Sequence, residues 1–551
     1  MAENIILDES KYRDRRSLRM KEYGFNAVIS KNVPARLHTF FEKKKYTLRT
    51  NALGFIENGN GISSTNRICV MGDSFSECFF MEEKDRFVSV CERELHDRGH
   101  DVELLNCSMT GMNIFHAVFV MLAKVLPLGV SKVIYITSNS DYQSSRMNDG
   151  DFFTHDKVYS IFNEEKEISE RNKPVYTNYN RLLNTLYSIC KLAKIELIFA
   201  LRPFESTDKR RQINVVTERF LLRKNIKCID LRSFYCEKCY YDNTHLTNKS
   251  SILFGKYFSN ILHDILINEA KDQYTPFKIR NNPFIFNDFF PSRVLKLKER
   301  PAMVRVVKRT LGTADEAYWG DATFFLNTDE YSFSDNANGI YTRDKIVVIG
   351  DSFIECFFMA PEERLLSVAE RELRDSYHCK KELLNCSMGG ANILHSIFTF
   401  LAKIAFMESS IVLYSPSIND YKCLCIPGTF YTNHKNLSIF EMDSIIRDKV
   451  RPQYDIYSLY IRIFYSICNI FGHKLVFVLR PFHGGGSVDM LNKTAISFCH
   501  KKNIEFIDLR KFSEEEVEKM HYDRGHLLPE GARILGKLLA KNLYEQGLVT
   551  A

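Results

Sequence analysis

The stretch Lys345 to Cys356, KIVVIGDSFIEC, decides the fold because it occurs twice in the chain. Its partner is Arg67 to Cys78, RICVMGDSFSEC. In each copy an apolar run typical of a buried strand stops at Gly-Asp-Ser-Phe, and a helical pattern follows. We therefore expect a serine at a strand-to-helix corner, where its hydroxyl and the free N–H groups of the helix face the same space.

A simpler interpretation of the two serines is a capping role. Ser74 and Ser352 each begin the pattern S-x-x-E, which ends at Glu77 and Glu355 and is typical of a capping box. Taken alone, this pattern favours two helix N-caps. The companion residues described below favour a chemical role instead.

The rest of the chain repeats with the serine. The words GDSF, ECFFM, LLNCSM, LRPF and IDLR recur in the same order at an offset of 278 or 279 residues, and His526 follows His245 by 281. A chain of 551 residues also exceeds what one hydrophobic core usually supports. We therefore predict two tandem domains, a first copy at residues 1–270 and a second copy at 271–551.

Strand and helix patterns alternate within each copy. Such alternation predicts parallel strands joined by right-handed helical crossovers, and hence an α/β fold in the form of a three-layer α/β/α sandwich. In the first copy we expect strands at 68–71, 102–106, 133–137, 195–200 and 226–229, and helices at 87–95, 114–126, 182–192 and 246–267.

Composition and charge exclude several classes of protein. Hydrophobic residues make up 45% of the chain and charged residues 26%, which is typical of globular domains, and the net charge of +7 does not favour nucleic-acid binding. The first residues lack the apolar core of a signal peptide, and lysines interrupt the most apolar stretches, so we expect no membrane span. The 15 cysteines are an odd number. Reduced thiols in a cytoplasmic protein fit this count best.

A metal or cofactor is not expected either. Cys236 and Cys239 are spaced as C-x-x-C, but no second cysteine pair stands at zinc spacing. We therefore predict no metal site and no organic cofactor.

A serine hydroxyl becomes a good nucleophile only when a base takes its proton, and the base must be held in one tautomer. Each copy supplies a D-x-x-H sequence near its end, Asp242 with His245 and Asp523 with His526. This tetrapeptide is common, and a surface aspartate with a helix-start histidine is its usual explanation. Its recurrence 171 and 174 residues after the serine favours a catalytic pair in each copy.

Acyl transfer also needs donors for the oxygen that becomes negative in the tetrahedral intermediate. After the second strand, each copy reads Asn-Cys-Ser-Met-x-Gly, which places Gly111 and Gly390 at the sheet edge. A plain turn glycine is the alternative. After the third strand, Asn419 of the second copy is a further candidate donor, and Ser140 stands at the matching position in the first copy.

The ordered set of blocks resembles the SGNH, or GDSL-type, hydrolase family over most of each copy. The resemblance implies a flavodoxin-like domain with a five-stranded parallel sheet. It also implies roles for the residues quoted above. The nucleophiles would be Ser74 and Ser352, the bases His245 and His526, the orienting acids Asp242 and Asp523, and the oxyanion donors Gly111, Gly390 and Asn419.

The first copy departs from the family pattern at Ser140, where the family carries an asparagine. Loss of one oxyanion donor costs about 10² to 10³ in rate. We therefore expect the second copy to be the better catalyst, and the first copy to be weakly active, differently specific or purely structural.

Three other features have two interpretations each. Arg202 and Arg480 follow the fourth strand in Leu-Arg-Pro-Phe and could bind an anionic part of the substrate or satisfy carbonyls at the turn. The aromatic segments 152–162 and 430–440 could form a lid or pack over the sheet. The basic clusters at 13–16 and 43–45 could be a solvated helical face or a docking surface for an anionic partner. The sequence leaves the role of the basic segment 293–309 open.

The sequence therefore predicts a serine esterase that cleaves an O-acyl ester of a small molecule or carbohydrate, for example an O-acetyl group. Two alternatives remain. An O-acyltransferase would use the same residues with a hydroxyl acceptor in place of water. An inactive scaffold or binding protein would keep the fold without turnover. The sequence leaves the oligomeric state open.

Overall fold

The structure of the chain is a computed structural model. It describes the residues 6–8, 18–19, 21, 23, 26–147, 152, 156–161, 172–204, 209–234, 238–269, 294–295, 306–309, 324–326, 334, 336, 338, 345–407, 409–440, 444–483, 486–523 and 525–550. The basic clusters at 13–16 and most of the segment 293–309 lie outside these ranges.

The chain forms two compact units. We call Arg19–Val294 the N-terminal unit, and Met1–Leu18 with Leu295–Ala551 the C-terminal unit. The division differs from the expected boundary at 270 in one notable way. Strand β1 (Ile6–Asp8) pairs in parallel with β11 (Val306–Arg309), so the first residues of the chain belong to the second unit.

The N-terminal unit is built on a five-stranded sheet in which every neighbouring pair is parallel. Its strand order is β6-β5-β7-β8-β9. This order is that of flavodoxin-like doubly wound folds, as expected. The strands are β5 (Arg67–Met71), β6 (Glu103–Asn106), β7 (Lys132–Ile136), β8 (Glu196–Leu201) and β9 (Cys228–Asp230).

The C-terminal unit repeats this sheet in the order β14-β13-β15-β16-β17, again all parallel. Its strands are β13 (Lys345–Ile349), β14 (Glu382–Asn385), β15 (Ser409–Tyr414), β16 (Lys474–Leu479) and β17 (Phe506–Asp508). Two α/β/α sandwich domains, predicted from the repeated words, are therefore confirmed.

Helices cover both faces of each sheet because the buried strands are apolar on both sides. In the N-terminal unit, α3 (Phe87–Asp97) and α9 (Asn248–Glu269) share one core with alternate strand residues such as Ile68 and Val70. On the opposite face, Phe199 of β8 packs edge-on against Phe220 of α8. That layer contains α4 (Ile114–Val120), α7 (Thr177–Leu192) and α8 (Gln212–Lys224).

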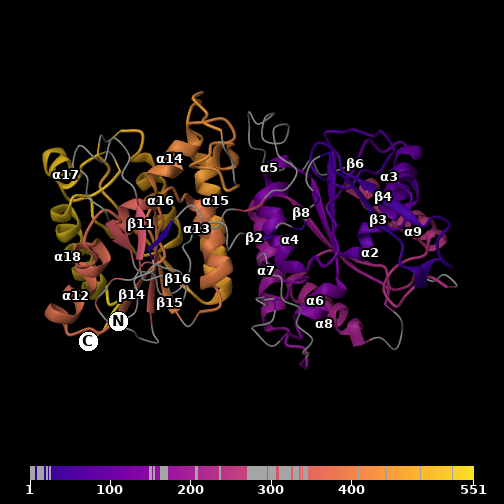
Figure 1. The fold of residues 1–551 in the computed structure, drawn as a ribbon, viewed down its shortest axis with the longest axis horizontal. Helices are drawn as coiled ribbons and strands as arrows, with labels where there is room; N and C mark the ends of the chain where they lie inside the picture. The colour runs from indigo at the N-terminus through magenta and orange to yellow at the C-terminus, as the bar shows by residue number, and fades with distance from the viewer. Residues whose placement is uncertain are drawn as a thin grey trace. The chain divides into compact units, whose positions relative to one another are not determined.

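In the C-terminal unit the same two layers appear on either side of the sheet (Figure 1). Helices α12 (Leu365–Tyr377) and α18 (Pro529–Glu545) form one layer and pack closely on each other. The other layer contains α13 (Ile393–Thr399), α15 (Tyr454–Phe471) and α16 (Met490–Lys502).

Shorter elements connect these layers and differ most from expectation. The predicted helix at 114–126 is interrupted by a π-helical turn, Met121–Val125, and the second copy has the same turn at Phe400–Ile404. Helices α8 and α16 were not predicted, because few apolar residues mark their buried faces. The remaining connectors are α5 (Leu126–Leu128), α6 (Asn139–Ser144), α14 (Ile418–Leu424), α17 (Glu514–Met520), and the 3-10 turns Glu83–Asp85, Lys209–Arg211, Pro361–Glu363 and Thr429–Tyr431.

Small strands lie outside the central sheets. An antiparallel hairpin of β3 (Val28–Asn32) and β4 (Lys45–Arg49), with the turn Ala35–Leu37, belongs to the N-terminal unit. In the C-terminal unit, β11 pairs antiparallel with β12 (Phe324–Leu326). The two-residue strands β2 (Leu18–Arg19) and β10 (Val294–Leu295) lie where the chain passes from one unit to the other.

The described residues bear on two expectations from the sequence, the absence of a membrane span and the presence of reduced thiols. No helix in the described part of the chain has the length and apolar composition that crossing a bilayer requires. No disulfide bond is formed among the described cysteines, most of which are buried.

Gly536 of α18 lies against the first turn of α12. A Cβ atom there would come within 2.6 Å of the Leu365 carbonyl oxygen and 2.9 Å of Val368 Cβ. We expect Gly536→Ala to lower the free energy of unfolding by about 1–3 kcal/mol through overpacking, despite the gain of about 1 kcal/mol in helix propensity. Thermal unfolding followed by circular dichroism measures the change. The matched control is Lys537→Ala on the exposed side of α18, expected to stay within about 0.5 kcal/mol, and an equal effect of both changes would contradict the close contact.

Candidate active site

The serine of each Gly-Asp-Ser-Phe corner is the first residue of a one-turn helix, but it is not the N-cap. Asp73 caps α2 (Ser74–Glu77) and accepts a hydrogen bond from the N–H of Phe75 at 3.0 Å. Asp351 caps α11 (Ser352–Glu355) in the same way. The capping-box interpretation of the serines is therefore wrong.

The glutamates of the S-x-x-E patterns contact the glycine loops instead. Glu77 accepts a hydrogen bond from the Thr110 hydroxyl, and Glu355 accepts one from the N–H of Gly389 at 2.9 Å. Each glutamate thus ties the serine turn to the residue that precedes Gly111 or Gly390. Burial raises the pKa of Glu77 to about 7, against the opposing effect of the Thr110 hydrogen bond. The sequence analysis missed this contact with the glycine loop. The one sequence feature that pointed to it is that the glutamate recurs at the same position in both copies.

The aspartate before each serine is buried and is the hub of the corner. Asp73 accepts hydrogen bonds from the Ser138 hydroxyl and the Asn139 N–H, both at 2.8 Å, and it forms an ion pair with Arg202 at 3.2 Å. In the second copy, Asp351 accepts from the Ser417 hydroxyl at 2.7 Å and pairs with Arg480 at 2.6 Å. The first, third and fourth strands thereby meet at one carboxylate in each unit.

In the N-terminal unit the three predicted catalytic side chains form a chain of hydrogen bonds. The Ser74 Oγ lies 2.7 Å from Nε2 of His245, and Nδ1 of His245 lies 2.8 Å from Oδ2 of Asp242. Asp242 also accepts the backbone N–H groups of Thr244 and His245. Burial alone would raise the pKa of Asp242, but these hydrogen bonds and the nearby imidazole lower it. The carboxylate is therefore ionised at neutral pH and fixes the imidazole.

In the C-terminal unit the acid and the base meet, but the serine does not join them. His526 Nδ1 lies 2.7 Å from Oδ2 of Asp523. Ser352 and His526 line the same small cavity of about 10 Å³, although no hydrogen bond joins these two described residues. The rest of that cavity is formed by Cys356, Phe357, Phe358, Met359, Tyr522 and Leu527.

The predicted oxyanion donors have unequal surroundings. Gly111 and Gly390 both adopt a left-handed backbone, with φ of 76° and 77°, which favours glycine. A Cβ atom at Gly111 would also come within 2.8 Å of the Val158 carbonyl oxygen. The amide of Asn419 donates to the Ala391 carbonyl at 3.2 Å, which engages one of its two hydrogens. Ser140 is buried, and its N–H donates to the Ser138 hydroxyl.

Arg202 and Arg480 do not face a substrate. Their side chains are 0% and 1% exposed, and both guanidinium groups pack between the aspartate hub and two phenylalanine rings. A group that binds a substrate anion must be reachable from solvent. The suggested substrate-binding role is therefore corrected in favour of the structural alternative.

The aromatic segments also follow the structural alternative where they are described. Phe152 is stacked on Tyr179 of α7 at a centroid distance of 5.9 Å. Phe430 meets Tyr460 of α15 edge-on at 5.2 Å. These rings are buried against the helical layer and do not form an open wall.

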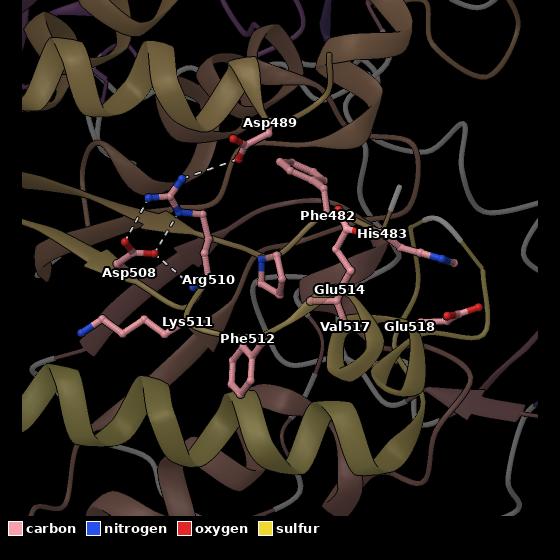
Figure 2. A pocket seen from close by; sticks show the side chains of 11 residues that line it. Phe482, His483, Asp489, Asp508, Arg510, Lys511, Phe512, Glu514, Val517 and Glu518 are labelled. Atoms are coloured by element: carbon pink, nitrogen blue, oxygen red, sulfur yellow. Dashed lines mark hydrogen bonds and ion pairs between the residues drawn. The ribbon is translucent and has the colours of Figure 1, made fainter. Parts of the chain in front are cut away.

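A larger groove of about 550 Å³ lies beside the C-terminal site, at the carboxyl ends of β16 and β17. Figure 2 shows Arg510 directed between Asp508 and Asp489 in this groove. Neither Ser352 nor His526 lines it, so its size does not make it the reaction centre. Its lining is Pro481, Phe482, His483, Asp489, Asp508, Arg510, Lys511, Phe512, Glu514, Val517 and Glu518.

Within the described ranges, no group of three or more His, Cys, Asp or Glu side chains could hold a metal ion. Cys236 lies outside the described residues, and Cys239 is half-buried.

Comparison with known proteins gives distant structural matches. No family model and no curated protein matches the sequence. An acetylxylan esterase from Geobacillus stearothermophilus is 16% identical, with 38% of this chain and 96% of that chain covered and a TM-score of 0.29. A putative lipolytic protein of the G-D-S-L family from Desulfitobacterium hafniense is 14% identical, with coverages of 36% and 99% and a TM-score of 0.27. The esterase EstA from Pseudoalteromonas is 13% identical, with coverages of 37% and 100% and a TM-score of 0.29.

The contact between Asp523 and His526 predicts a measurable titration. Burial would raise the pKa of Asp523, but the hydrogen bond and charge of His526 and the N–H of Gly525 lower it to about 2. This lowered pKa stabilises the fold above about pH 4, and the contribution is lost as the pH falls towards 2. We expect His526→Ala to raise the pKa of Asp523 to its ordinary value or above, because burial remains. Carboxyl ¹³C NMR of aspartate-labelled protein measures it, with the exposed His500→Ala as the control, and an unchanged pKa in His526→Ala would contradict the contact.

Proposed function

We propose that this chain is a serine esterase of the SGNH type that cleaves an O-acyl ester through an acyl-serine intermediate. The observation that carries the proposal is the continuous chain Ser74–His245–Asp242, with contacts of 2.7 and 2.8 Å. The second copy has the same three residue types in the same order, with the acid–base contact formed. A hydroxyl, an imidazole and a carboxylate in this geometry are the parts of an activated nucleophile.

The reaction follows from what each group can do. The imidazole takes the serine proton as Oγ attacks the ester carbonyl, and the carbonyl oxygen becomes an oxyanion next to the glycine loop and the helix N-terminus. The imidazolium then protonates the leaving alcohol as its C–O bond breaks. Water, deprotonated by the same histidine, attacks the acyl-serine, releases the acid and restores the serine. The acid partner stays ionised and holds the imidazole orientation throughout.

Two observations bear on which copy turns over faster. The amide of Asn419 supplies an oxyanion donor that the first copy lacks, because Ser140 stands there. The Ser–His contact, by contrast, is formed only in the first copy among the described residues. Catalytic hydrogen bonds often tighten only when substrate binds, whereas a missing donor is not restored by binding. We therefore propose that the second copy is the better catalyst.

Two other functions use the same geometry. An O-acyltransferase would pass the acyl group to a hydroxyl acceptor instead of water, which depends on acceptor binding and water exclusion. The aromatic and charged side chains of the groove beside β17 could hold such an acceptor. An inactive scaffold would retain the fold, and the buried surroundings of Gly111 favour this state more for the first copy than for the second.

Single-serine variants test both the chemistry and the ranking. In the wild-type protein we expect a fluorophosphonate probe to label Ser352 and Ser74, because both are proposed nucleophiles. Ser352→Ala should remove most hydrolysis of p-nitrophenyl acetate, about tenfold or more, and Ser74→Ala should remove less. The double variant is the baseline.

The outcomes separate the possibilities. Labelling of neither serine in folded protein would reject the esterase in favour of the scaffold. Near-full activity of the Ser352→Ala variant would reject the proposed ranking while leaving the chemistry in place.

Acceptor dependence distinguishes the esterase from the transferase. We expect hydroxyl acceptors such as xylose or glycerol to leave the rate of p-nitrophenol release unchanged and to yield no acylated acceptor, because water completes the reaction. Mass spectrometry of the products measures this, with the double serine variant as control. Accumulation of acylated acceptor in place of free acid would favour the transferase.

A further inference from the structure

The loop that carries the base of the N-terminal unit is held by a buried arginine. Arg202 donates through Nη1 to Asp73 at 3.2 Å and through Nη2 to the carbonyl oxygen of Thr244 at 2.8 Å. Asp73 immediately precedes the nucleophile Ser74, and Thr244 immediately precedes the base His245. One planar guanidinium therefore connects the backbone turns that carry the two reacting side chains.

A second arginine holds the same loop from the outside. Arg210 donates through Nη2 to the carbonyl oxygen of Asn243 at 2.9 Å and through Nη1 to the Thr244 hydroxyl at 2.5 Å. It lies in the 3-10 turn before α8 and is only half-buried. The two residues between Asp242 and His245 are thus fixed from both sides.

The second copy lacks half of this arrangement. Arg480 pairs with Asp351 at 2.6 Å, but its Nη2 is buried and has no hydrogen-bond partner among the described residues. Gly525 stands at the position of Thr244, and Val488 stands 278 residues after Arg210. The same copy is the one in which Ser352 and His526 share a cavity without a hydrogen bond. In the N-terminal unit the arginine contacts and the serine–histidine contact are thus formed together, and among the described residues of the C-terminal loop, which exclude residue 524, neither is found.

We propose that Arg202 and Arg210 are positioning residues that place His245 against Ser74. This inference rests on the proposed function, since it assigns to the two arginines the alignment of the nucleophile with its base. The serine turn is anchored to the sheet through Asp73, whereas the base lies on a loop that follows the edge strand. In the second copy, where the described residues do not show this link, Ser352 and His526 line one cavity without a hydrogen bond between them.

The rate of attack by Ser74 depends on the distance between its hydroxyl and the imidazole of His245. A misplacement of about 1 Å between reacting groups can cost about 10² in rate. The imidazole still contacts its aspartate in both copies, at 2.8 and 2.7 Å, so the acid does not decide the difference. What differs among the described residues is the set of arginine contacts to the loop.

The test measures fluorophosphonate labelling of both serines in the same molecules by peptide mass spectrometry. In Arg210→Val we expect Ser74 labelling to slow by about tenfold or more while Ser352 labelling is unchanged. Arg202→Lys keeps a charge beside Asp73 but cannot reach both partners, so it should act in the same direction. The matched control is Lys209→Val, which removes a charge from the same turn without touching the loop.

A double variant of the C-terminal unit tests the reverse change. If the arginine contacts only stabilised the fold, adding them would not increase the labelling rate of Ser352. Val488→Arg combined with Gly525→Thr supplies the missing groups, and a Cβ atom at Gly525 meets nothing closer than 3.5 Å. We expect Ser352 labelling to rise about tenfold. This variant and Arg210→Val keep the test informative if Arg202→Lys fails to fold.

The outcomes distinguish this inference from the function on which it rests. Absence of labelling at both serines in the wild-type protein would reject the proposed function. Labelling of both serines, with the Ser74 to Ser352 ratio unchanged in Arg210→Val and no gain in the double variant of the C-terminal unit, would overturn the positioning role alone.

Discussion

The buried ion pair between the corner aspartate and the fourth-strand arginine is the constraint on which each unit depends. Removal of one partner from a buried pair typically costs about 3–5 kcal/mol, because an uncompensated charge is left behind. Here the aspartate also caps the serine helix and accepts the hydroxyl that follows the third strand. The carboxylate can satisfy all these donors only when three strand ends and one helix start are in place. The position of the nucleophile is therefore a property of the whole sheet edge.

Much of the fold and of the candidate site could be predicted from the sequence, because the chain contains two similar copies of one domain that can be compared with each other. The repeated words indicated two domains, the alternation of elements predicted parallel strands in a three-layer sandwich, and the D-x-x-H pairs were found at similar spacings of 171 and 174 residues from the serine. What the pattern missed were partners chosen by three-dimensional packing. Nothing in Leu-Arg-Pro-Phe distinguishes an exposed guanidinium from one enclosed by Asp73 and Phe75. The S-x-x-E pattern likewise predicts a cap, whereas Glu77 contacts a loop 33 residues away.

The two copies show how one framework can support different states of a site. Both keep the hub, the glycine with positive φ and the acid–base contact. They differ at Thr244 and Gly525, and at Arg210 and Val488, all outside the reacting groups. Such positions lie on connecting segments, where a substitution costs the core nothing. Besides the change from Asn419 to Ser140, the two copies therefore differ in how the loop that carries the base is held.

The pairing of β1 with β11 has a consequence for how the chain folds as it leaves the ribosome. Ile6 has its partner at Val306, so this strand emerges long before the segment it joins. Domains generally fold as units during synthesis, N-terminal first. The N-terminal unit can complete its own sheet, from Arg67 to Asp230, before β11, the partner of β1, has been synthesised. A nascent chain stalled between the two units would thus carry a finished first sandwich preceded by an unpaired strand.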